Sequence, residues 1–114
     1  MREIKFRAWR PKNKTMIYFE DNLMYIKQIL ITLIFEKSKY LMQFIGLKDK
    51  NGIEIYEGDV LKGITKYNRE KFNKNRVYFI KGTIMCGNVS LYNCTDIEVI
   101  GNIYENKELL DDRN

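Results

Sequence analysis

Short apolar runs separated by turn residues are the feature that most restricts the fold of this 114-residue chain. The clearest case is the pair Asn51-Gly52, which lies between the apolar runs YLMQFIGL and IEIY. Both residues tolerate the positive φ that a tight turn between antiparallel strands requires. The pattern therefore predicts a β-hairpin around residues 51 and 52.

The N-terminal residues alternate between apolar and charged side chains, which is typical of a half-buried strand. In a strand over residues 3–10, Ile4, Phe6 and Ala8 share one face, and Arg7 lies on the charged face. The turn sequence PKNK follows, and the β-rich run TMIYF comes next. We therefore expect the chain to open with another hairpin.

The C-terminal half offers five short strands at close intervals, with turn residues between them, from about residue 55 to residue 104. This spacing is typical of a small barrel, and we expect an SH3-like barrel here. The polar, basic stretch 66–76 is interpreted as a long, solvated hairpin tip. The first strand begins at about residue 55, and the others are expected at 59–64, 77–85, 89–92 and 96–104.

Two residues near the C-terminus have expected local roles. Gly101, inside the last predicted strand, is expected to mark a β-bulge or a close backbone approach. Asn106 is expected to cap a short terminal helix that runs through Leu110.

The apolar run 23–35 has two interpretations. Its spacing matches one stripe of a helix, whereas its β-branched and aromatic residues favour a buried strand. A strand is preferred, and a helix packed over a sheet is the alternative. The fold class is therefore mainly β, with a β-rich α+β fold possible. Residues 1–54 are expected to form an N-terminal β-rich lobe, and residues 55–114 the barrel lobe with a short tail, in one compact unit.

Positive charge is concentrated in the middle of the chain, which carries a formal net charge of +5. Residues 62–81 contain seven Lys or Arg and one acid, whereas residues 95–114 contain six acids and two bases. Cations that neutralise phosphates, next to aromatic rings that stack on bases, are the minimum chemistry for sequence-tolerant nucleic-acid binding. Most such charge runs are solvated loops. The candidate contact residues are Lys66, Tyr67, Arg69, Lys71, Phe72, Lys74 and Arg76.

The residues available for catalysis are few. The chain has no His, which removes the commonest general base and metal ligand. Cys86 and Cys94 fit no zinc pattern and are interpreted as buried structural thiols. Glu57 and Asp59 are close enough in the chain to act as paired catalytic carboxylates, but a turn with Asp59 accepting backbone N–H bonds explains them better. We expect no catalytic residues, cofactor, metal or small-molecule substrate.

Targeting features are also missing from the sequence. The opening residues lack the continuous apolar core of a signal peptide, and the run 23–35 is too short to span a bilayer. We therefore expect a cytoplasmic protein with reduced thiols and no membrane partner.

Three segments together resemble the YopX family of phage and prophage proteins. They are MREIKFRAW at the start, LMQFIGLKDKNGIEIYEGDVL in the centre and EVIGNIYENKELL near the end. The resemblance implies a β-structured fold with an SH3-type barrel in its C-terminal half, a phage origin and a bacterial host cell. It implies no catalytic or binding residues, because none are established for the family.

The sequence and its resemblance to the family favour a non-enzymatic phage accessory protein that acts by protein–protein contacts. The apolar run 23–35 motivates this hypothesis, because exposed apolar patches usually mark interfaces. Its partner would be a second copy or another phage or host protein. The alternative is a nucleic-acid-binding module that uses residues 62–81. The remaining aromatic residues, among them Phe6, Tyr18, Phe19, Phe79 and Tyr92, are expected to lie in the core.

Overall fold

The computed structural model describes residues 5–19 and 40–111. The N-terminal strands are β1 (Phe6–Arg10), β2 (Thr15–Phe19), β3 (Leu41–Lys48) and β4 (Glu54–Tyr56). The later strands are β5 (Asp59–Thr65), β6 (Lys71–Ile80), β7 (Thr83–Cys86), β8 (Val89–Ser90) and β9 (Cys94–Asn102). A 3₁₀ turn, η2 (Leu91–Asn93), precedes β9, and a short helix, α2 (Glu108–Asp111), follows it.

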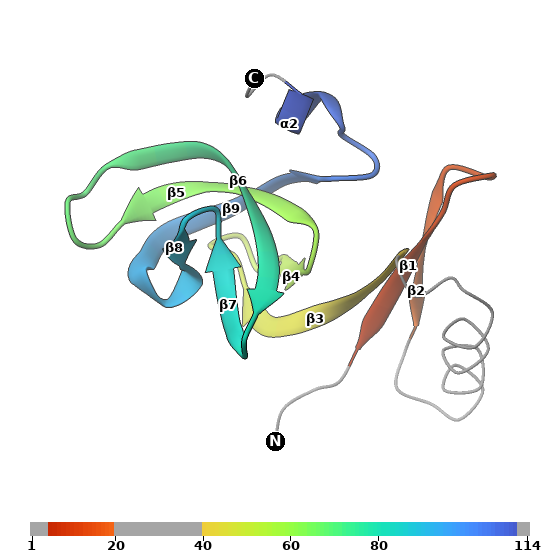
Figure 1. Cartoon of the computed structure of the whole chain (residues 1–114), viewed down its shortest axis with the longest axis horizontal. Coiled ribbons are helices and arrows are strands. Elements are labelled where there is room, and N and C mark those ends of the chain that lie inside the picture. Colours follow the sequence, from red (N-terminus) through yellow and green to blue (C-terminus); the bar gives the residue numbers. More distant parts are fainter. Residues whose placement is uncertain (1–4, 20–39, 112–114) are drawn as a thin grey trace.

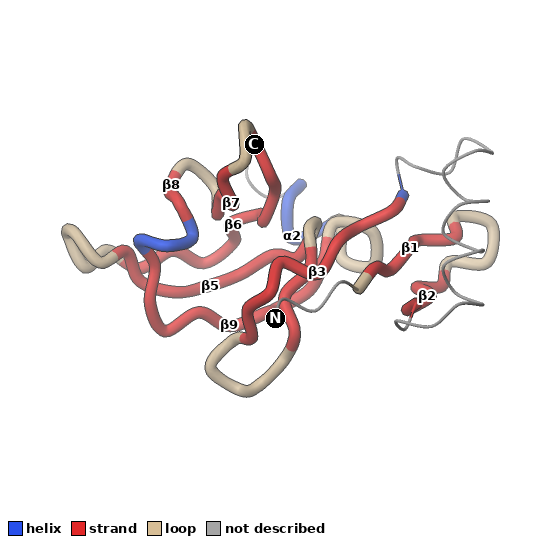
Figure 2. Tube along the Cα trace, turned by 90° about the horizontal axis from the view of Figure 1, so that it is seen from below, coloured by secondary structure: helices blue, strands red, loops and turns tan. Residues whose placement is uncertain are grey.

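These strands form two antiparallel sheets (Figure 1). One sheet has the order β2-β1-β3-β4, and the other has the order β8-β7-β6-β5-β9. The five-stranded sheet curls into a half-barrel (Figures 1 and 2). The mainly β fold, with an N-terminal hairpin region and a small C-terminal barrel, is therefore confirmed. The whole run 23–35 lies outside the described residues, as does the rest of 20–39.

Strand β3 connects the two sheets. Its first residues pair with β1. Its later residues pair with β4, with a register shift between the pairs made by Phe44 and Lys48. Figure 2 shows β3 running from the hairpin of β1 and β2 toward the half-barrel. Ile45 of β3 and Ile55 of β4 join the half-barrel's own apolar residues in one core. Burial of this apolar surface is the main force that holds the two sheets together.

The turn between β3 and β4 confirms the hairpin predicted at Asn51-Gly52. Asp49 is 7% exposed, and its carboxylate accepts backbone N–H bonds from Asn51 at 2.8 Å and Ile53 at 2.9 Å. It also accepts the N–H of Val99, in β9, at 2.9 Å. One side chain thus shapes the turn and ties it to the edge of the half-barrel.

The expected solvated tip over 66–76 is wrong in its extent. Strand β6 begins at Lys71, so only residues 66–70 form the tip. Lys71 pairs with Ile64 of β5, and Phe72 packs against the core while the residues beside it are exposed. Polar residues are tolerated in this strand because its outer face meets solvent.

The strand expected over 77–85 is also wrong, because two strands occupy it. Lys81 and Gly82 form the turn between β6 and β7, with φ values of 49° and 80°. Ile80 pairs with Thr83, so the loop contains two residues. Two consecutive positive φ values are the signature of the tight turn that fits the twist of paired strands. Lys is an unusual residue at the first position, which is why the sequence pattern did not indicate this turn.

Of the two expectations for the C-terminal residues, the one for Gly101 is confirmed and the one for Asn106 is wrong. Val60 pairs with Gly101 and Leu61 with Val99, so β9 has a bulge next to Gly101 as predicted. A Cβ atom at Gly101 would lie 2.6 Å from Asn106 Oδ1, so the close approach is confirmed too. The short helix exists, but Asn106 does not cap it as expected: its Oδ1 instead accepts the N–H of Asn102, at 3.1 Å.

Candidate functional site

The tip of the β5–β6 hairpin is a well-bonded turn. The N–H of Thr65 donates to the carbonyl of Glu70 at 2.9 Å and closes the turn. Asn68 Oδ1 accepts hydrogen bonds from the Thr65 hydroxyl and from the N–H of Glu70. The turn therefore holds its shape without a partner, and its side chains project from a fixed backbone.

Two tyrosine rings stand at this end of the half-barrel. Tyr67, at the tip, is 81% exposed, and Tyr92, in η2, is 84% exposed. The N–H of Lys66 donates to the carbonyl of Asn93 at 2.8 Å, which joins the tip to η2. The ammonium of Lys66 lies 5.2 Å from the centre of the Tyr92 ring, within reach of a cation–π interaction.

The expectation that Tyr92 lies in the core is wrong. The turn of η2 buries Leu91, which is 4% exposed, and directs the next residue outward. Tyr18 and Phe79 were also expected in the core, but they are 53% and 38% exposed, whereas Phe19 is buried as expected. A single apolar residue in a short turn gives no periodic pattern from which to predict its direction.

The β6 residues named as contacts divide into two groups. Lys71 and Arg76 are exposed, whereas Lys74 is half-buried. Phe72 packs against the core beside Gly63, where an added Cβ would lie 2.8 Å from the Phe72 ring. Phe72 is therefore half-buried against the core, which reduces the ring surface that it can offer to a base.

Beside Lys71 the outer surface of the half-barrel is hollowed into a cleft of about 290 Å³. Lys62 lies 3.6 Å from Glu98, and Lys50 lies 3.4 Å from Glu98 and 3.5 Å from Asp96. The charge of Asp96 raises the pKa of Lys50. Two acids thus partly neutralise this basic wall. The cleft is lined by Lys50, Lys62, Gly63, Ile64, Lys71, Phe72, Asn73 and Asp96.

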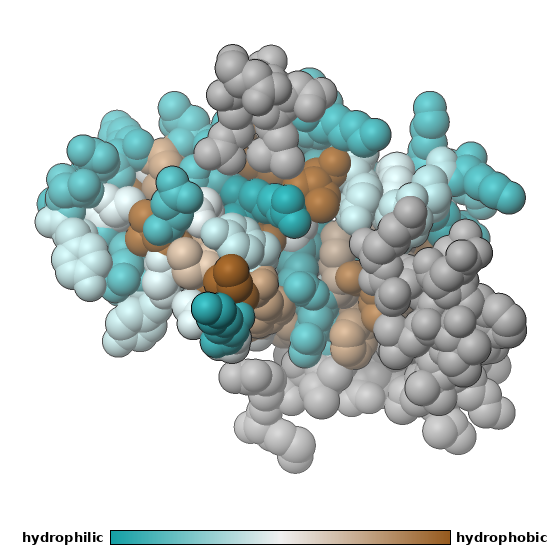
Figure 3. Space-filling view, viewed as in Figure 1, coloured by the Kyte–Doolittle hydropathy of each residue, from teal (hydrophilic) through white to brown (hydrophobic). Residues whose placement is uncertain are grey.

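Four other cations of the hairpin carry uncompensated charge. Within residues 5–19 and 40–111 they have no ion-pair partner, and all four are exposed. Figure 3 shows hydrophilic side chains predominating over the end of the molecule that carries the tip of the β5–β6 hairpin. These four residues are Lys66, Arg69, Lys71 and Arg76.

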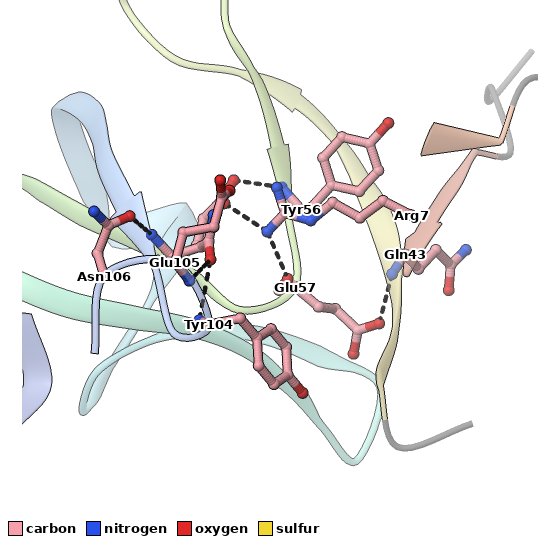
Figure 4. Close-up of polar contacts among 9 residues, drawn as sticks. Arg7, Gln43, Tyr56, Glu57, Tyr104, Glu105 and Asn106 are labelled. Carbon is pink, nitrogen blue, oxygen red and sulfur yellow. Dashed lines mark hydrogen bonds and ion pairs between the residues drawn. The ribbon is translucent and has the colours of Figure 1, made fainter. Parts of the chain in front are cut away.

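A second polar cluster, which sequence reasoning missed, lies between the two sheets. Arg7 of β1 donates from Nη2 to Asp59 Oδ1 at 2.7 Å, and their side chains are 4% and 2% exposed. The same nitrogen lies 3.3 Å from the carbonyl of Glu57, and the guanidinium lies 4.7 Å from the Tyr56 ring centre. Figure 4 shows Arg7 beside Tyr56 and Glu57. Alternation along β1 predicted Arg7 on an exposed face, but the β4–β5 loop covers that face.

Asp59 is held from two sides. Its second oxygen accepts the N–H of Tyr56 at 2.8 Å, as the turn interpretation predicted, and Gly58 takes a φ of 87°. Burial raises the pKa of Asp59, and the charge of Arg7 opposes that rise. The Arg7 guanidinium thus offsets part of the cost of a buried carboxylate.

The segment after β9 completes this region. Asn102 Oδ1 accepts the N–H groups of Tyr104 at 3.0 Å and Glu105 at 2.8 Å, and its amide donates to the Glu105 carboxylate. Figure 4 shows Tyr104, Glu105 and Asn106 of this segment in the same close-up as Arg7. An open cleft of about 610 Å³ lies here, with Arg7, Asp59, Asn102 and Glu105 among its lining residues.

The side chains of Glu57 and Asp59 do not face the same cleft. Asp59 lines the large cleft, whereas Glu57 turns toward β3 and accepts the N–H of Gln43 at 2.8 Å. In the described part of the chain no group of three or more His, Cys, Asp or Glu side chains could hold a metal ion. None of the helices described is long and apolar enough to cross a membrane.

The two cysteines are buried, as expected, and neither forms a disulfide. Burial raises the pKa of the Cys86 thiol to about 12. It raises the pKa of Cys94 as well. The thiolate is the nucleophilic form of Cys, so both side chains behave as small apolar core residues in the folded protein.

Comparison with known proteins places the chain in a family. The family model described as YopX protein matches residues 5–111. The chain belongs to the YopX family. The crystal structure of protein EF1440 from Enterococcus faecalis is similar, with a TM-score of 0.63 and 26% identity over 96% of this chain and 99% of that chain. A search of curated proteins finds no match.

In this YopX protein, the three segments that resemble the family meet in space. Arg7 comes from the opening segment, Asp59 from the central one and Asn102 from the closing one. All three line the large cleft, and the Arg7–Asp59 ion pair joins the two sheets. The shared segments therefore build the junction between the sheets, whereas the basic hairpin lies outside them.

Proposed function

We propose that this YopX protein is a non-enzymatic nucleic-acid-binding module that holds a phosphate backbone on the β5–β6 hairpin. The observation that carries the proposal is a set of four exposed cations without ion-pair partners among the described residues. They follow the β5–β6 hairpin: three lie at or beside its tip, and Arg76 lies farther along β6, opposite Val60. Solvated cations of this kind release condensed counterions when they meet phosphates, which drives binding without sequence preference. The net charge of +5 favours the same partner.

The proposal predicts that charge reversal on the hairpin removes binding without unfolding the protein. The test variant carries Lys66→Glu, Lys71→Glu and Arg76→Glu. If each cation contacts one phosphate, the slope of log K against log salt for a DNA duplex falls by about 3. Each exposed substitution changes stability by less than about 0.5 kcal/mol. Fluorescence anisotropy with a labelled oligonucleotide at several salt concentrations measures the slope.

The matched control reverses the same number and kinds of charge elsewhere. Arg10, Lys12 and Lys107 are exposed and lie away from the hairpin. The variant with all three replaced by Glu has the same net charge as the test variant. We expect it to keep most of the parent's affinity and salt slope. Equal losses in both variants would mean that net charge alone drives binding, and the hairpin would not be the site.

A second candidate function is contact with a protein partner, a second copy of this chain included. The supporting observation is the pair Leu47 and Ile53, which are 48% and 52% exposed on either side of the β3–β4 turn. Apolar side chains exposed together often mark interfaces. A homo-oligomer predicts a mass by light scattering that rises with concentration toward a multiple of one chain. A constant single-chain mass over a wide concentration range would exclude self-association. The role as a phage accessory protein in the host cytoplasm stays an expectation.

A further inference from the structure

We infer that the hairpin site selects single-stranded over double-stranded nucleic acid, because Tyr67 and Tyr92 stack on unpaired bases. This inference rests on the proposed function and adds its substrate class. Both rings are more than four-fifths exposed, so the fold makes little use of their apolar faces. A base that stacks on such a ring buries apolar surface on both partners.

The two rings are supported by a backbone that is already ordered. Lys66 joins the tip to η2 through its N–H bond to Asn93, and the Asn68 side chain closes the tip. Ser90 accepts the N–H of Tyr92 at 3.3 Å and fixes the start of η2. Less conformational entropy is lost on binding when the contact residues are held in advance.

Cations lie near the Tyr92 ring and beside the tip that carries Tyr67. The ammonium of Lys66 is 5.2 Å from the Tyr92 ring centre, and Lys71, which pairs with Ile64, directly follows the tip. Lys71 also lines the cleft of about 290 Å³ together with Lys62 and Asn73. Phosphates held by these side chains would bring the bases of the same strand to the tyrosines. Alternating aromatic and cationic contacts are the common arrangement for binding a single strand.

A duplex cannot use the whole site. Its bases are stacked on one another and paired, so their faces do not reach Tyr67 or Tyr92. Only its phosphates remain available to Lys66, Lys71 and Arg76. Charge and stacking therefore both contribute to single-strand affinity, whereas charge alone contributes to duplex affinity.

The test compares Tyr67→Ala/Tyr92→Ala with Tyr67→Phe/Tyr92→Phe on a labelled single-stranded oligonucleotide and on the duplex of the same sequence, at low salt. The parent should bind the single strand more tightly. The double Ala variant should lose between about 5-fold and about 150-fold in single-strand affinity for each ring that stacks. Its duplex affinity should stay within about 2-fold of the parent's. The double Phe variant keeps both rings and should match the parent on both ligands.

The outcomes separate this inference from the proposed function. Equal binding of both ligands by the parent, or no loss in the double Ala variant, would overturn the stacking role while leaving phosphate binding in place. Equal losses on single strand and duplex would do the same, because they would indicate a damaged tip. No binding of either ligand by the parent at low salt would overturn both. Circular dichroism of each variant checks that the strands are intact.

Discussion

Replacing Arg7 with Met is expected to lower the free energy of unfolding by about 3–5 kcal/mol, the typical cost of removing one partner from a buried ion pair. Arg7 and Asp59 approach to 2.7 Å with side chains 4% and 2% exposed, so little water reaches the carboxylate to compensate for the lost guanidinium. The substitution leaves a carboxylate buried between the two sheets without its cation. Urea unfolding followed by far-ultraviolet circular dichroism measures the change.

An exposed ion pair supplies the control for this prediction. Lys62 and Glu98 lie 3.6 Å apart with side chains 49% and 28% exposed, so Lys62→Met should cost less than about 1 kcal/mol. The double variant Arg7→Met/Asp59→Leu should cost less than the sum of its two single changes, because the stranded charge is gone. If Arg7→Met cost no more than Lys62→Met, the ion pair would not hold the sheets together.

Replacing Asp49 with Ala is expected to cost about 3 kcal/mol at neutral pH, because three backbone N–H groups lose an ionised acceptor. Two of them shape the β3–β4 turn, and the third belongs to Val99 in β9. The hairpin that carries Ile55 into the core should therefore loosen from the half-barrel. Glu108→Ala removes a carboxylate from an exposed position and should change the stability by less than about 0.5 kcal/mol.

The pH dependence of the Asp49 effect has a definite sign. Burial alone would raise the pKa of Asp49, but the N–H bonds from Val99, Ile53 and Asn51 outweigh it and lower the pKa below its usual 3.8. A carboxyl group with a lowered folded pKa stabilises the protein above its unfolded pKa and loses that contribution as the pH falls through the folded pKa. The gap between parent and Asp49→Ala should therefore narrow below about pH 4. A gap that is constant from pH 7 to pH 3 would show that the charge of Asp49 is unimportant.

Local signals in the sequence predicted local structure well. The Asn51-Gly52 turn, the PKNK turn and the glycine at 101 each depend on residues close together in the chain, where turn chemistry decides the conformation. The first part of strand β6, residues 71–76, escaped prediction because its Lys and Asn residues have the composition of a solvated loop. Pairing with β5 and β7 outweighs their low strand propensity.

The candidate sites also divide into features set by neighbouring residues and features set by contacts between distant residues. The basic segment 62–81 was visible in the sequence because charge needs no fold to be recognised. Arg7 and Asp59 are 52 positions apart, and nothing local in the sequence indicates that the fold buries them together. Tyr92 was missed because a three-residue turn, not a periodic strand, sets the direction of its ring.

The most direct test of the central claim is an NMR titration of the ¹⁵N-labelled protein with a short single-stranded oligonucleotide at low salt. We expect the largest amide shifts at Lys66, Tyr67, Lys71 and Tyr92, and we expect these shifts to shrink as salt is added. Shifts confined to the cleft around Arg7 and Asp59, or no shifts at all, would contradict nucleic-acid binding at the hairpin.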